Sequence, residues 1–171
     1  LTPPIGAEFI DVVMGDDDQL VLLASDVGYG FISNLGNLKS KTKSGKNAIT
    51  LPNKSKVMKI VLVEDLESQY VAVATNRGRL LIFPIAELPL LSKGKGNKLI
   101  QIPATDLTAR KEIVTGLCAL NETQKLRVYY GKRKTLYKSE DWMHFVSHRA
   151  RRGKELRPGY VTNIVYITAE D

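Results

Sequence analysis

Lysine and glycine stand together in two short stretches whose residue types suit the binding of phosphate. Residues Lys93–Pro103 read Lys-Gly-Lys-Gly-Asn-Lys-Leu-Ile-Gln-Ile-Pro, and residues Lys43–Pro52 read Lys-Ser-Gly-Lys-Asn-Ala-Ile-Thr-Leu-Pro. When Gly45 is placed on Gly96, an isoleucine and a proline follow at the same offsets of four and seven. Each stretch is therefore a basic, glycine-bearing loop that runs into an extended apolar segment.

A third and looser copy of this loop lies at Arg149–Gly159, with Gly153 in the equivalent place. Glycine admits positive φ and carries no side chain, so a glycine loop can bring its backbone N–H groups close to a phosphate. Lysines beside it neutralise phosphates and release counterions, and such contacts position DNA without reading its sequence. We predict that the three copies are equivalent loops that contact duplex DNA.

The predicted DNA-binding residues are the cations of the three loops and those on two hairpin turns. In the loops they are Lys39, Lys41, Lys43, Lys46, Lys93, Lys95, Lys98, Arg149, Arg151, Arg152 and Lys154; on the turns they are Arg77, Arg79, Lys132, Arg133 and Lys134.

The distribution of charge supports an anionic polymer as the partner. The net charge is +7, but residues 1–38 hold six acids and no Lys or Arg, whereas residues 39–59 hold seven lysines and no acid. Residues 125–157 hold eleven Lys and Arg against three acids. Charge segregated in this way predicts one strongly positive face or rim.

Other chemistries find little support in the sequence. The glycine loops lack the Walker spacing and each runs into a strand, which disfavours nucleotide hydrolysis. His144 and His148 stand four residues apart, but no carboxylate or cysteine completes a metal site with them. Asp16-Asp17-Asp18 does not follow EF-hand spacing. The single cysteine, Cys118, lies in an apolar run and is expected in the core. We predict no catalytic centre, no metal and no cofactor in this chain, and no apolar run is long enough for a membrane span.

The elements that must position the loops are short hairpins that recur every fifty residues or so. Leu20–Ala24 and Tyr29–Ser33 flank an Asp-Val-Gly turn, and Tyr70–Thr75 and Arg79–Phe83 flank Asn-Arg-Gly. A third hairpin is expected at Leu126–Tyr137. After each basic loop a longer strand is expected, at Met58–Val63, Ile113–Leu120 and Val161–Ile167, and Phe9–Met14 matches the first of these.

Four strands in each repeat of this length are typical of radial blades, so the fold is expected to be all-β. Residues 1–171 are taken as a single domain with repeats at roughly 1–18 (partial), 19–66, 67–122 and 123–171, which we interpret as a fragment of a longer protein with about three full blades and part of another. Helices are expected to be short, at Leu107–Lys111 and Glu140–Arg149. The aromatics Phe31, Phe83, Trp142 and Tyr166 are expected to be packing residues.

Specific runs resemble the C-terminal domain of the A subunit of bacterial DNA topoisomerase IV, which is related to the corresponding domain of gyrase. They are Leu1–Ser25, Gly28-Tyr-Gly-Phe31, Phe83-Pro84, Leu88-Pro89, Leu91-Ser-Lys-Gly-Lys-Gly-Asn-Lys98, Gly131-Lys-Arg-Lys134 and Arg151-Arg-Gly153. The resemblance covers nearly the whole chain and is weaker over residues 104–125 and 138–150.

The resemblance implies a β-pinwheel, a propeller-like disc whose neighbouring blades exchange strands, that binds and bends duplex DNA on a basic rim. It implies a cytoplasmic, nucleoid-associated parent enzyme, an A2B2 assembly with an ATPase subunit, whose ATP and magnesium sites lie on other domains. Such an enzyme relaxes and decatenates DNA and serves chromosome segregation. Gyrase carries a Gln-Arg-Arg-Gly-Gly-Lys-Gly box, of which Lys93–Asn97 and Arg151–Lys154 are incomplete relatives, so tight gyrase-like wrapping is not expected.

Two alternatives remain at this point. A propeller-like protein-interaction module with incidental basic charge would bind protein partners independently of salt and would have no measurable affinity for DNA. An enzyme would need a metal or nucleotide, which a thermal-shift screen would reveal.

Overall fold

The three hairpins expected from the sequence form the framework of the molecule. The computed structural model describes residues 2–157 and 162–171. The hairpins consist of β1 (Leu20–Ala24) with β2 (Tyr29–Asn34), β4 (Tyr70–Thr75) with β5 (Arg79–Pro84), and β8 (Lys125–Tyr130) with β9 (Arg133–Tyr137).

The first two hairpins turn in the same way because a glycine takes the position that needs positive φ. Gly28 and Gly78 have φ of 84° and 81°, and their N–H groups donate to the carbonyls of Ser25 and Thr75, each at 3.1 Å. The third hairpin has a tighter turn, with only Gly131 and Lys132 between its strands.

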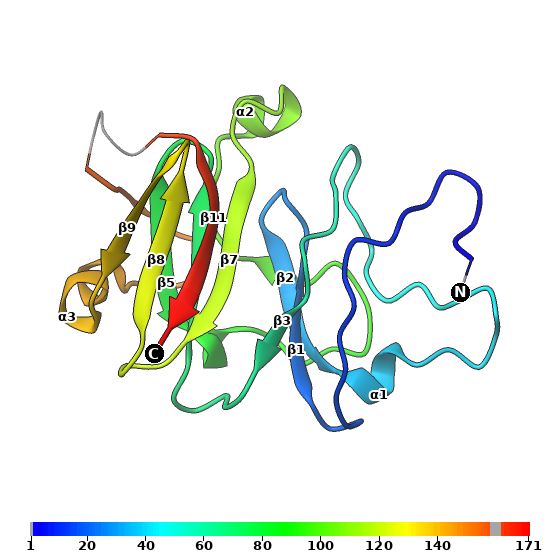
Figure 1. The fold of residues 1–171 in the computed structure, drawn as a ribbon. Coiled ribbons are helices and arrows are strands. Elements are labelled where there is room, and N and C mark those ends of the chain that lie inside the picture. The colour runs from blue at the N-terminus through cyan, green and yellow to red at the C-terminus, as the bar shows by residue number, and fades with distance from the viewer. Residues whose placement is uncertain (1, 158–161) are drawn as a thin grey trace.

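Three antiparallel sheets are built on these hairpins and stand side by side (Figure 1). The strand orders are β3-β1-β2-β6, β10-β5-β4-β7 and β11-β8-β9. The added strands are β3 (Val61–Val63), β6 (Asn97–Lys98), β7 (Val114–Leu120), β10 (Lys154–Glu155) and β11 (Ile164–Glu170). Strand β7 contacts both β3 of the first sheet and β11 of the third.

Neighbouring sheets exchange strands at the opposite edge. The strand β6 follows β5 in the chain but pairs with β2, where Lys98 lies opposite Tyr29. In the same way β10 follows β9 but pairs with β5, where Glu155 lies opposite Arg79. The second and third basic loops therefore each add the outermost strand to the preceding sheet, which places them on the rim.

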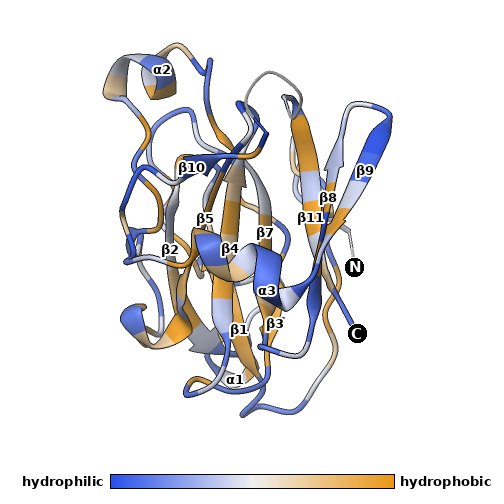
Figure 2. Cartoon of the chain, turned by 90° about the vertical axis from the view of Figure 1, so that its left-hand side faces the viewer, coloured by the Kyte–Doolittle hydropathy of each residue, from blue (hydrophilic) through white to orange (hydrophobic). Residues whose placement is uncertain are grey.

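The second sheet is buried on both faces, which explains why its strands are apolar without interruption. Val71 and Val73 pack against the first sheet, whereas Ala72 and Ala74 pack against the third, in a cluster that includes Trp142. Figure 2 shows these apolar strands inside the molecule and a hydrophilic β9 and β10 at its margins. Cys118 is buried in the second of these clusters, as predicted.

Short helical turns link the hairpins to the rim loops. Asn34 caps the first by accepting a hydrogen bond from the Asn37 N–H. The expected helices at Leu107–Lys111 and Glu140–Arg149 are present but shifted or shorter. The turns are α1 (Leu35–Leu38), η1 (Ile85–Glu87), α2 (Ala104–Thr108), α3 (Ser139–Trp142) and η2 (Met143–Phe145).

Some predictions about the strands and the aromatic residues were wrong. The segment Phe9–Met14 forms no strand, and its apolar side chains are largely exposed. The strand expected at Met58–Val63 is shortened to β3. Phe31, Phe83 and Trp142 are buried, but Tyr166 is 46% exposed and stacks on Tyr129 across the sheet.

The strand expected at Val161–Ile167 is β11, which extends to Glu170. The first residue of the expected strand, Val161, lies outside the described residues, as does the end of the third loop copy, residues 158–159.

Candidate nucleic-acid interface

The three basic loops are joined edge to edge by backbone hydrogen bonds. We call them the first loop (residues 39–50), the second loop (93–101) and the third loop (149–155), and together the loop belt. The Thr50 N–H donates to the Gly94 carbonyl at 2.8 Å, which joins the first loop to the second. The Gln101 N–H donates to the Arg151 carbonyl at 2.8 Å, and the Ala150 N–H to the Leu99 carbonyl at 2.9 Å. The belt is therefore a continuous path across all three repeats.

The glycines of the second and third loops have a role that differs from the one expected. A Cβ on Gly96 would lie 2.1 Å from the Gly30 carbonyl oxygen, and one on Gly153 would lie 2.8 Å from that of Leu80. These glycines let the rim strands approach β2 and β5, so their close backbone contact is with the protein. Gly45 has similar φ but meets no atom within 4 Å.

Several of the predicted cations point to solvent without an acidic partner. Lys41, Lys43, Lys93 and Arg151 are exposed, and none forms an ion pair within the part of the chain that the structure describes. Their charge is fully available to an anion on the rim.

Other loop lysines are oriented by neutral groups, so no acidic side chain offsets their charge. Lys95 lies over the ring of Tyr29, with Nζ 4.3 Å from the ring centroid, a cation–π contact. The other three donate to neutral oxygens: Lys46 to the Asn37 carbonyl at 2.5 Å, Lys98 to the Gln101 side chain at 3.1 Å, and Lys154 to the His144 carbonyl at 3.0 Å.

The predicted arginines are mostly engaged within the protein. Arg149 donates to the Lys98 carbonyl at 2.6 Å, Arg152 forms a bidentate pair with Glu112, and Arg79 bonds both Gly153 and Glu155. Arg77 lies 3.6 Å from Asp106. Arg149, Arg152 and Arg79 thus bond to residues of the belt, whereas Arg77 pairs with α2 outside it.

Lys39 pairs with Asp17 and is also partly neutralised. Lys132, Arg133 and Lys134 are exposed at the tip of the β8–β9 hairpin. They lie on the third sheet and outside the belt.

Sequence reasoning missed Arg110, a cation that lies beside the first hairpin turn. Arg110 lies 2.5 Å from Asp26, which is 5% exposed, and also donates to the Lys54 carbonyl at 2.7 Å. The hydrogen bond from Arg110 to Asp26 raises the pKa of Arg110 further above its ordinary value. A lone Asp in the turn was the one sequence signal for this contact.

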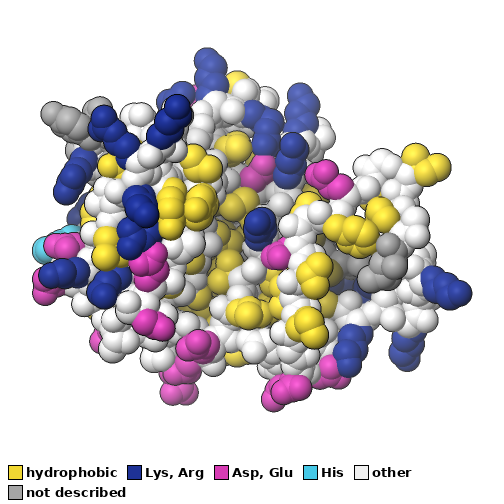
Figure 3. Space-filling model, in the orientation of Figure 1, with side chains coloured by type: hydrophobic (Ala, Val, Ile, Leu, Met, Phe, Trp, Pro, Cys, Tyr) yellow, Lys and Arg dark blue, Asp and Glu magenta, His cyan; other side chains and the backbone are white. Residues whose placement is uncertain are grey.

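Acidic side chains gather along one edge of the molecule. In Figure 3, Lys and Arg are frequent along the upper and left margins, whereas Asp and Glu dominate most of the lower margin. The turns before β1, β4 and β8 carry acids at Asp16–Asp18, Glu64–Glu67 and Glu122. An anionic polymer would be attracted to the basic side of the disc and repelled from this edge.

Comparison with known proteins places the chain in a family. The profile of a family described as DNA gyrase C-terminal domain, β-propeller, matches residues 19–64 and 69–117, which is more than half of the chain. The chain belongs to this family. The membership confirms the resemblance noted in the sequence and the expected all-β, propeller-like fold.

Its relatives include subunits of topoisomerase IV. The chain is similar to the A subunit of DNA topoisomerase 4 from Pseudomonas aeruginosa (43% identical over 160 residues, 94% of this chain and 21% of that protein) and to that from Haemophilus influenzae (42% over 170 residues, 99% and 23%). It thus spans about a fifth of the length of these curated relatives.

Two solved structures of this family are similar in fold. The E. coli ParC C-terminal domain matches with a TM-score of 0.88 and 36% identity, over 100% of this chain and 68% of that one. A DNA gyrase A C-terminal domain matches with a TM-score of 0.70 and 15% identity, over 91% of this chain and 50% of that one, which is a likeness of fold alone. No helix among the described residues is both long and apolar enough to span a membrane.

Proposed function

We propose that this chain binds duplex DNA without sequence specificity along the loop belt and bends it. The observation that carries the proposal is the continuity of the belt, because backbone hydrogen bonds join the three basic loops edge to edge. Lysine contacts to phosphates supply affinity and position but do not read bases.

Bending must be offset by many contacts. Smooth bending of a 20–30 base-pair site by 40–90° costs on the order of 1–6 kcal/mol. The available cations on the belt, Lys41, Lys43, Lys93, Lys95 and Arg151, lie in all three loops, so their phosphate contacts would be spread over the three loops.

We further propose that the chain serves as the C-terminal domain of the A subunit of topoisomerase IV in a cytoplasmic, nucleoid-associated enzyme. In that role it would present DNA segments to a catalytic core for relaxation, decatenation and chromosome segregation. The core's ATP and magnesium sites, and its contacts with the ATPase subunit, would lie on other parts of the A2B2 assembly. The similarity to the A subunits of topoisomerase 4 supports this proposal.

The test is a binding titration with labelled duplexes of unrelated sequence. The triple variant K93A/K95A/K98A removes three positive charges from the second loop and should weaken binding to every duplex alike. The control K59A/K125A/K138A removes the same charge elsewhere: Lys59 precedes β3, Lys125 is the first residue of β8, and Lys138 follows β9. This control should bind nearly as wild type. Equal losses in both triples would contradict the belt, and absence of DNA binding by wild type would favour a protein-interaction module.

A further inference from the structure

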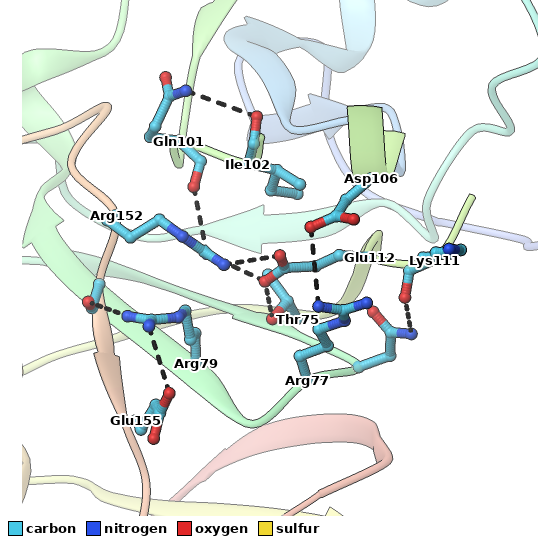
Figure 4. A network of polar contacts seen from close by, with 12 residues as sticks. Thr75, Arg77, Arg79, Gln101, Ile102, Asp106, Lys111, Glu112, Arg152 and Glu155 are labelled. Carbon is cyan, nitrogen blue, oxygen red and sulfur yellow. Dashed lines mark hydrogen bonds and ion pairs between the residues drawn. The ribbon is translucent and has the colours of Figure 1, made fainter. Parts of the chain in front are cut away.

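A buried carboxylate lies where the second and third loops meet. The side chain of Glu112, just before β7, is 0% exposed, and it is the carboxylate at the centre of the network in Figure 4. A buried carboxylate is costly unless it is paired and hydrogen-bonded, so its partners are informative.

The partners of Glu112 come from separate parts of the chain. Arg152, in the third loop, donates to Oε1 at 2.9 Å and to Oε2 at 2.6 Å. The Thr75 hydroxyl, at the end of β4, donates to Oε1 at 2.9 Å. The same Arg152 guanidinium also reaches the carbonyl of Gln101, the last residue of the second loop, at 3.3 Å. Glu112 thus fastens the third loop to the second loop and to the second sheet at once.

The neighbouring contacts make this network the centre of the joint between the two loops. Backbone bonds from Ala150 to Leu99 and from Gln101 to Arg151 lie beside it. A bidentate arginine–carboxylate pair fixes direction as well as distance, because both groups are planar. At the joint between the first and second loops no such pair occurs among the described residues; the Arg110–Asp26 pair ties Arg110 to the first hairpin turn and to Lys54 instead.

We propose that Glu112 is a positioning residue that sets the angle between the second and third loops, and through it the curvature of bound DNA. By holding Arg152 inward, it also keeps that guanidinium from serving as a phosphate contact. This inference rests on the proposed DNA-binding function and assigns the regulation of bend, as distinct from affinity, to one buried side chain.

The experiment measures bend and affinity separately on the whole chain. A duplex of about 30 base pairs, labelled at both ends, reports bending by energy transfer at saturating protein, over the length at which bending is costly. Glu112→Gln should reduce the transfer change to less than half of that of wild type while binding stays as tight or tighter. The slope of log K against log salt should become steeper by about 0.9, the contribution of one phosphate contact, because Arg152 is released.

The control Glu140→Gln removes the same charge from an exposed residue of α3, outside the loop belt. It should bend DNA as wild type does.

The second test variant, Arg152→Lys, keeps the charge but loses the bidentate geometry. Like Glu112→Gln, it should bend DNA less than wild type, and it tests the proposal if Glu112→Gln does not fold.

Two results would overturn the inference: full bending by both variants, or a parallel loss of bend and affinity with a lowered melting temperature, which indicates a merely structural role. Absence of binding by wild type would instead overturn the proposed function.

Discussion

Replacing Gly96 by alanine tests how the rim strands dock. The new Cβ would lie 2.1 Å from the Gly30 carbonyl oxygen and 2.3 Å from its carbon, both backbone atoms that cannot rotate away. The second loop would have to move off β2, and the short β6 pairing would be lost. Gly45→Ala is a matched control because its φ of +85° is close to the +81° of Gly96, but its Cβ meets nothing within 4 Å.

Because the two φ values are nearly equal, the cost of a left-handed alanine cancels between the variants. The remaining difference is the clash and about two lost hydrogen bonds, roughly 2 kcal/mol or more. For a chain of this size, that corresponds to a melting temperature about 4–8 °C lower for Gly96→Ala than for Gly45→Ala. Gly153→Ala, with its Cβ at 2.8 Å from the Leu80 oxygen, should fall between them.

Thermal unfolding followed by circular dichroism measures all three variants under the same conditions. Equal melting temperatures for Gly96→Ala and Gly45→Ala would refute the docking role of Gly96. That result would instead favour the role suggested by the sequence, in which these glycines let the backbone N–H groups approach a phosphate.

Three further predictions concern single side chains. Lys93→Ala should reduce the slope of log K against log salt by about 0.9, measured by fluorescence titration, and an unchanged slope would exclude Lys93 from phosphate contact. Tyr29→Leu removes the ring beneath Lys95 and should weaken DNA binding by about 0.5–1 kcal/mol without altering the melting temperature greatly; equal affinity would show that the contact does not orient Lys95. Burial raises the pKa of the Cys118 thiol to about 12, whereas the unfolded thiol ionises near pH ~8.5. The contribution of Cys118 to stability is therefore present below about pH 8.5 and is lost as pH rises towards 12. Cys118→Ala should flatten the alkaline decline in unfolding free energy measured by urea titration, and an identical decline would contradict this.

The hairpins could be predicted because their signals are local. Apolar runs around Asp-Val-Gly and Asn-Arg-Gly specify strand, turn and strand within about fifteen residues. The repeat of Gly45 at Gly96 predicted equivalent loops, but only Gly96 and Gly153 lie against a neighbouring strand, whereas a Cβ on Gly45 would meet nothing within 4 Å. The resemblance supplied the exchange of strands between neighbouring sheets, which no local pattern contains.

The fate of individual charges could not be predicted, because partners far apart in the chain decide it. Arg152 and Arg151 are adjacent and identical in type, yet one is held by Glu112, forty residues earlier, and the other faces solvent. Phe9–Met14 has the composition of a strand, but a strand also needs a neighbour to pair with, and composition does not report one. Tyr166 was predicted to pack because aromatic residues usually do; its place on the outer face of the last sheet leaves it half exposed.

The most direct test of the account is the salt dependence of duplex binding by the whole chain. The five available cations of the belt, Lys41, Lys43, Lys93, Lys95 and Arg151, predict a slope of log K against log salt of about −4.5, equal for duplexes of unrelated sequence. A slope shallower than about −1, or an affinity that depends strongly on sequence, would contradict a belt that binds DNA through its phosphates.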